Sequence, residues 1–64
     1  MENELINKVA DEFIERFKVP KSKYKIRILK KVISEYLKDC PYEEFDQFSW
    51  SEIMEGYDEL LNEK

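Results

Sequence analysis

With 64 residues and a net charge of −4, the chain has room for one domain, and its 42% hydrophobic and 41% charged residues exclude a disordered tail and a membrane-spanning protein. A chain this short buries only about 60% of the surface that its unfolded form exposes, so we expect its core to need a second chain, as a homodimer or a bound target. It has no histidine, one cysteine and one glycine, which excludes an internal disulfide, the common zinc spacings, histidine-activated nucleophiles and glycine-rich phosphate loops. We therefore predict no catalytic residue, no metal, no cofactor and no enzymatic activity.

The first predicted element is a helix over residues 2–18. Apolar residues recur there in pairs every four positions, which is the spacing of one helix face and not of a strand. The helix is expected to stop at Val19 and Pro20, because a residue before proline is pushed out of helical geometry. The stripe consists of Leu5, Ile6, Val9, Ala10, Phe13, Ile14 and Phe17.

The second predicted element is a helix over residues 22–39, with Ser22 as a candidate N-cap and an end just before Pro41. Its apolar pattern is the longest without interruption, so we expect it to be the central helix of the fold. The stripe consists of Ile28, Leu29, Val32, Ile33, Tyr36 and Leu37.

The last part of the chain predicts a short helical turn over residues 41–47 and a third helix over residues 50–62. The apolar stripe of this third helix consists of Trp50, Ile53, Met54, Tyr57, Leu60 and Leu61. Ser49, followed three residues later by Glu52, matches a capping box at the start of that helix. Gly56 lies inside the helix, so either another backbone comes close there or the helix is locally loose. Together these elements predict an all-α fold, a three- to four-helix bundle forming a single domain over residues 1–64.

Charge is strongly segregated along the chain. Residues 18–31 contain basic residues and no acid, whereas residues 32–64 are acidic apart from Lys38 and Lys64. Lysines near a helix N-terminus oppose the helix dipole, and the penalty is offset by a phosphate or by carboxylates of this chain or a second copy. The alternative is an ordinary solvated lysine face whose charges are screened by salt. The candidate anion- or nucleic-acid-binding residues are Lys21, Lys23, Arg27, Lys30 and Lys31.

The segment from Tyr42 to Leu61 interleaves aromatic residues with acids. Tryptophan and tyrosine are frequent interface anchors, and acids around them steer a basic partner, so the segment predicts a protein-binding surface. The alternative is that the aromatic residues cap the three-helix core, which is favoured for each of them taken singly. The predicted protein-binding residues are Tyr42, Glu43, Glu44, Phe45, Asp46, Phe48, Trp50, Glu55, Tyr57 and Asp58.

These patterns predict a non-catalytic protein-binding regulator, such as an inhibitor, antirepressor or adaptor. The acidic surface could mimic DNA phosphates and occupy a nucleic-acid-binding protein, and the size suggests a phage or other mobile element as its source. Trp50→Ala is expected to abolish binding without loss of helicity. The alternatives are a nucleic-acid-binding regulator that uses the basic helix face, or an antitoxin or immunity protein. A cytoplasmic setting is expected, because Cys40 has no disulfide partner and no signal peptide is evident.

Overall fold

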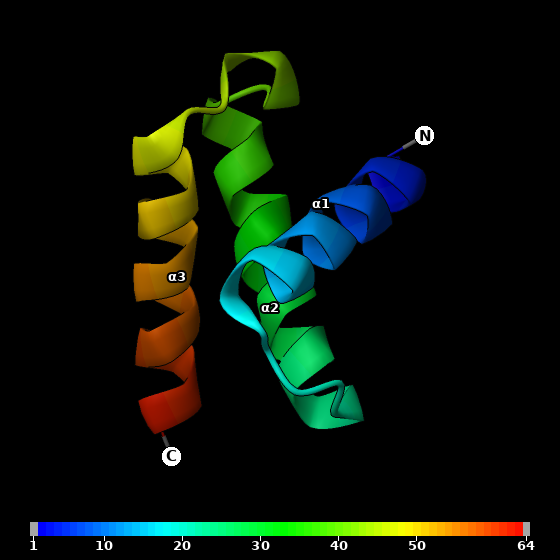
Figure 1. Ribbon diagram of the computed structural model, residues 1–64. Coiled ribbons are helices and arrows are strands. Elements are labelled where there is room, and N and C mark those ends of the chain that lie inside the picture. The colour runs from blue at the N-terminus through cyan, green and yellow to red at the C-terminus, as the bar shows by residue number, and fades with distance from the viewer. Residues whose placement is uncertain (1, 64) are drawn as a thin grey trace.

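Three helices and one short turn form the fold in the computed structural model, which describes residues 2–63 (Figure 1). The elements are α1 (Glu2–Phe17), α2 (Lys23–Asp39), the 3-10 turn η1 (Tyr42–Glu44) and α3 (Gln47–Asn62). Helices α2 and α3 lie side by side and antiparallel, and α1 crosses α2 (Figure 1). The predicted all-α class is confirmed, and the bundle has three helices with a single 3-10 turn where a fourth short helix was considered.

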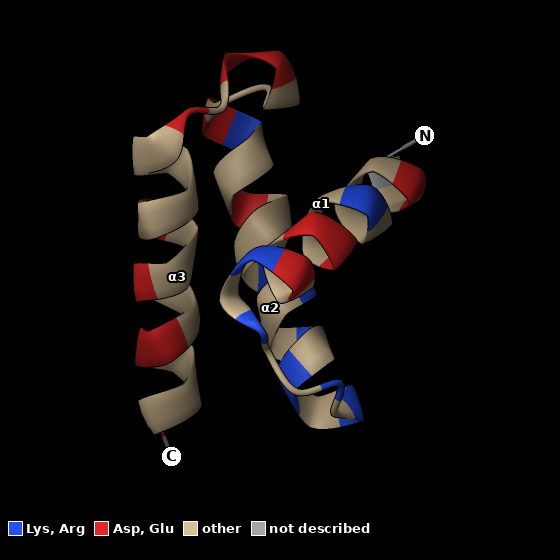
Figure 2. Ribbon diagram, in the orientation of Figure 1, with Lys and Arg blue, Asp and Glu red and all other residues tan. Residues whose placement is uncertain are grey.

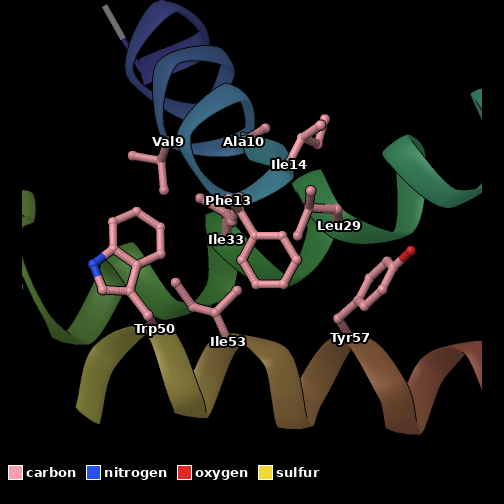
Figure 3. Close-up of a cluster of buried hydrophobic side chains, with 9 residues drawn as sticks. All are labelled: Val9, Ala10, Phe13, Ile14, Leu29, Ile33, Trp50, Ile53 and Tyr57. Carbon is pink, nitrogen blue, oxygen red and sulfur yellow. The ribbon is translucent and has the colours of Figure 1, made fainter. Parts of the chain in front are cut away.

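The core lies where the three helices meet, and each helix contributes to it (Figure 3). Residues of all three predicted apolar stripes are found there, because each stripe is the one face of its helix that can leave water. Helix α2 contributes the two fully buried residues Leu29 and Ile33 and lies between the other two helices. The buried cluster consists of Val9, Ala10, Phe13, Ile14, Leu29, Ile33, Trp50, Ile53 and Tyr57.

Helix α1 ends at Phe17, and the next residue has a left-handed backbone conformation. Lys18 has φ 56°, and the backbone N–H of Val19 donates to the carbonyl oxygen of Ile14 at 3.2 Å. This is the six-residue hydrogen bond of a Schellman ending, which satisfies a carbonyl group that the last helical turn leaves free. Val19 then packs against the core, so the chain turns before Pro20 and not at it.

Helix α3 begins three residues earlier than a cap at Ser49 predicts. Asp46 is the N-cap: its Oδ1 accepts from the backbone N–H of Ser49 at 3.1 Å. The hydroxyl of Ser49 accepts in return from the backbone N–H of Asp46, also at 3.1 Å. The capping box is therefore real but runs from Asp46 to Ser49, and the predicted pair Ser49 and Glu52 is wrong.

Gly56 lies where α3 packs tightly against α2. A Cβ placed on this glycine would lie 3.1 Å from Cγ1 of Val32, tighter than ordinary van der Waals contact. A close neighbour was one of the two expectations for this position, but the neighbour is a side chain and not a backbone. The neighbour is the side chain of Val32, a stiff β-branched residue on α2.

Candidate protein-binding surface

The side of α3 that points away from the core carries an exposed phenylalanine among acids. We call this side the α3 outer face. Phe48 is 77% exposed, the most exposed of the large hydrophobic side chains that the structure describes. The acids and a serine follow at helical spacing along the same side, and no lysine or arginine occurs from residue 39 to residue 63. The α3 outer face consists of Phe48, Ser51, Glu52, Glu55, Asp58 and Glu59, all exposed.

Two residues predicted as interface anchors lie in the core instead. Trp50 is 7% exposed and Tyr57 is 4% exposed, and both project from α3 into the buried cluster, on either side of Phe13 (Figure 3). Neither ring is available to a partner of the folded protein. The alternative interpretation, in which aromatic residues close a small core, describes Trp50 and Tyr57 correctly, and Trp50→Ala is not a clean test of binding.

Tyr42 and Phe45 are half-buried and join the turn η1 to the rest of the molecule. The Phe45 ring makes edge contacts with three neighbouring rings, those of Tyr36, Tyr42 and Trp50, with centroids 5.3–5.5 Å apart. The Tyr42 hydroxyl donates a hydrogen bond to the carboxylate of Glu12 on α1. These contacts hold the acidic turn in one place beside α3.

Two cations of α1 cover this aromatic cluster. The guanidinium of Arg16 lies 4.7 Å from the ring centroid of Trp50, and the ammonium of Lys8 lies 5.5 Å from that of Tyr42. Both separations are within the range of a cation–π interaction. The two positive charges therefore lie against the rings of Trp50 and Tyr42, whereas all the charged residues of the α3 outer face are acidic.

Tyr42 and Tyr57 have perturbed acidities for different reasons. The hydrogen bond to Glu12 raises the pKa of Tyr42, because an ionised phenol loses its donor and faces a carboxylate. Burial raises the pKa of Tyr57, with a smaller contribution from the neighbouring Asp58. Both hydroxyl groups therefore stay protonated at neutral pH.

The predicted acids differ in whether their carboxylates also stabilise the fold. Glu43 and Glu44 in η1, and Glu55 and Asp58 in α3, are exposed with their carboxylates in solvent. Asp46 is exposed as well, but its carboxylate also caps α3. Any substitution at Asp46 that removes the capping oxygen changes stability together with charge.

The predicted basic site is only partly assembled. Lys23, Arg27 and Lys30 line one open hollow of about 370 Å³ on α2, with Ile26 at its side. Lys21 lies elsewhere, beside acidic residues of α1, and Lys31 lines a groove that it shares with acids such as Glu59. The lysines and arginine gather at the N-terminal end of α2 and in the loop before it, and the acids gather in η1 and along α3 (Figure 2).

Sequence reasoning missed two sets of residues at or beside the candidate surface. Glu52 and Glu59 share the α3 outer face, and the helical spacing from Glu55 was a signal that could have found them. The contacts of Lys8, Glu12 and Arg16 with the aromatic cluster had no such signal, because they join residues about thirty positions apart, as Glu12 and Tyr42 are.

Within residues 2–63, no group of three or more histidine, cysteine or acidic side chains is arranged to hold a metal ion. In the same part of the chain, no helix has both the length and the apolar character needed to cross a bilayer. An apolar groove of about 270 Å³ lies between the start of α1, the end of α2 and η1, lined by Leu5, Leu37 and Tyr42 among others. No family model, curated protein or solved structure gives a significant match to this chain.

Proposed function

We propose that this protein is a non-catalytic regulator that binds a basic protein through the α3 outer face. The observation that carries the proposal is Phe48, an aromatic side chain 77% exposed to water at the start of a helix face whose charged residues are all acidic. Exposure of one apolar ring is common, but an aromatic anchor inside a single-sign field is typical of a binding site.

The surface supplies the two elements that a protein interface uses. Burial of the Phe48 ring in an apolar pocket supplies affinity, since a phenylalanine side chain contributes about 1.5–3 kcal/mol when it leaves water. The carboxylates of Glu52 and Glu55 follow one and two turns later and steer a positively charged partner, raising the association rate at low salt.

The matching partner has a positive surface with an apolar pocket, and nucleic-acid-binding proteins carry such basic patches. In that case the α3 outer face would occupy the site of DNA or RNA phosphates and inhibit binding. An antitoxin or immunity protein would use the same chemistry on a different target. The proposal places the chain in the cytoplasm with Cys40 reduced, and a mobile genetic element remains the origin that we favour for a chain this small.

The test is retention of a protein by the immobilised chain from a nuclease-treated lysate, compared between wild type and Phe48→Ala. We expect wild type to retain a basic protein stoichiometrically and Phe48→Ala to lose it, because the side chain is exposed and its removal leaves the core intact. Tyr24→Ala is the matched control, since Tyr24 is also exposed, at 58%, but lies on α2.

A second pair of variants tests the charges. Glu52→Lys combined with Glu55→Lys reverses two charges on the α3 outer face. Asp11→Lys combined with Glu15→Lys makes the same change in net charge on exposed residues of α1. Loss of the retained protein in the first variant alone supports the proposal. Equal loss in both variants, or retention that depends on nucleic acid, overturns it.

A further inference from the structure

We propose that α2 binds single-stranded nucleic acid through a second surface, the basic hollow formed by Lys23, Arg27 and Lys30 with the neighbouring Tyr24. This surface lies on a different helix from the α3 outer face, and the proposal does not depend on the protein-binding function. It specifies which residues contact the nucleic acid and that this nucleic acid is single-stranded.

The positive side chains that line this hollow are not neutralised by ion pairs within residues 2–63. Within residues 2–63, none of Lys23, Arg27 and Lys30 forms an ion pair; the surface ion pair that the structure does show joins Lys38 to Glu35 at 3.7 Å, at the other end of α2. Three cations at successive turns on one side of a helix repel one another. A polyanion laid across them relieves that repulsion and releases its own counterions.

The hollow also has the shape for a chain of phosphates. It is open, about 370 Å³ in volume, and the half-buried side chain of Ile26 lines it between the cations. The Lys30 side chain is itself half-buried, so its stem lies along the protein while its ammonium reaches solvent. With a rise of about 1.5 Å per residue, Lys23 and Lys30 are about 10 Å apart along the helix, which is room for two to three phosphates.

Tyr24 is the reason for choosing a single strand. Its ring is 58% exposed and it follows Lys23 directly, with Arg27 one turn further along the same side. An exposed aromatic ring next to cations is the combination that proteins use to stack unpaired bases. A paired duplex keeps its bases stacked on one another and offers no face to Tyr24.

A membrane surface does not fit this site, because the apolar side of α2 is packed in the core and cannot enter a bilayer.

The experiment is fluorescence anisotropy with a short labelled oligothymidylate, which has no tendency to pair, over a range of salt concentrations. We expect binding with a slope of log affinity against log salt of about −2, from about three phosphate contacts at −0.7 each. Lys23→Gln combined with Arg27→Gln is expected to weaken binding at least tenfold and to flatten the slope. Tyr24→Ser is expected to weaken binding about tenfold, as loss of one stacked base does.

A matched control distinguishes the effect of the hollow from the effect of overall charge. Lys8→Gln combined with Lys38→Gln also removes two positive charges and is expected to leave the affinity within about twofold, because neither lysine lines the hollow. No binding of the oligothymidylate at low salt overturns the proposal. Equal weakening by the two double variants, tighter binding to a duplex, or preference for phosphatidylserine vesicles over the oligothymidylate each overturns it too.

Discussion

Trp50 and Phe48 stand two residues apart at the start of α3, yet one ring is 7% exposed and the other 77% exposed. Two positions along a helix rotate a side chain by about 200°, so one points to the core and the other to water. The aromatic character that they share therefore says nothing about their use. Their place around the helix does, and it separates an inner face that stabilises the fold from an outer face that is available for contact.

The most direct test of this difference between the two faces is to remove each ring in turn. Trp50→Ala is expected to lower the free energy of unfolding by about 3–5 kcal/mol, because it empties a buried site that packs against Phe45 and carries Arg16 on its ring. A small domain has little more stability than this, so much of the variant should be unfolded at room temperature. Thermal unfolding followed by circular dichroism measures the loss.

Phe48→Ala is the matched change on the outer face. It is expected to alter the free energy of unfolding by no more than about 0.5 kcal/mol, because the ring has few contacts to lose. Equal destabilisation by the two substitutions would show that the inner and outer faces are not distinct.

The next largest effect is expected at Gly56, where the inner face of α3 meets α2. Gly56→Leu would push its side chain against Val32 and separate the two helices, costing about 1–3 kcal/mol. Urea denaturation measures the change. In a Val32→Ala background, Gly56→Ala should instead stabilise the fold by up to about 1 kcal/mol, since the space is free and alanine favours the helix. Full stability of Gly56→Leu would mean that the helices do not approach closely.

The helix cap tests whether charge and structure can be separated at Asp46. Asp46→Ala removes the oxygen that accepts from the backbone N–H of Ser49 and is expected to cost about 1 kcal/mol. Asp46→Asn keeps a capping oxygen and loses the charge, so its unfolding free energy should stay close to that of wild type. Denaturation of both variants in urea distinguishes these outcomes, and equal losses would show that the cap is electrostatic alone.

The same residues show how far sequence reasoning reaches. Helical spacing of apolar residues predicts the three helices and places Trp50 and Tyr57 in the third stripe, which is their correct position. The prediction that these two residues anchor a partner failed because it relied on residue type and not on their position around the helix. Phe48 lies off the stripe, so its exposure was readable from the sequence.

Other features depend on how the helices assemble. Asp46 and Ser49 are both good capping residues, and only the geometry of the turn before α3 shows which one begins the helix. The position of Arg16 over Trp50 follows from the angle at which α1 crosses α2, and no local pattern encodes that angle. Sequence therefore predicts the faces of single helices better than the contacts between them.

Among the contacts that stabilise the fold, the smallest effect is expected for Tyr42, which joins η1 to α1. Its pKa is raised by the hydrogen bond to Glu12, so the protonated form is favoured by the folded state. The resulting stability is fully present below the ordinary tyrosine pKa of about 10 and is lost as the pH rises through the higher pKa of the folded protein. Tyr42→Phe should cost about 0.5–1 kcal/mol at neutral pH, because the hydrogen bond is only partly shielded from water.

The pH dependence gives this prediction its control. Urea denaturation from about pH 8 to about pH 11 spans the ordinary tyrosine pKa of about 10, and stability of the wild type should fall across it. Tyr42→Phe should fall less, and so should Tyr57→Phe, because burial raises the pKa of Tyr57. Only Tyr42→Phe gives up a hydrogen bond to a carboxylate at neutral pH, so it should be the less stable of the two at the low end of the range. The opposite order there would mean that the bond to Glu12 does not hold η1 against α1, and that packing of Phe45 alone positions the acidic turn.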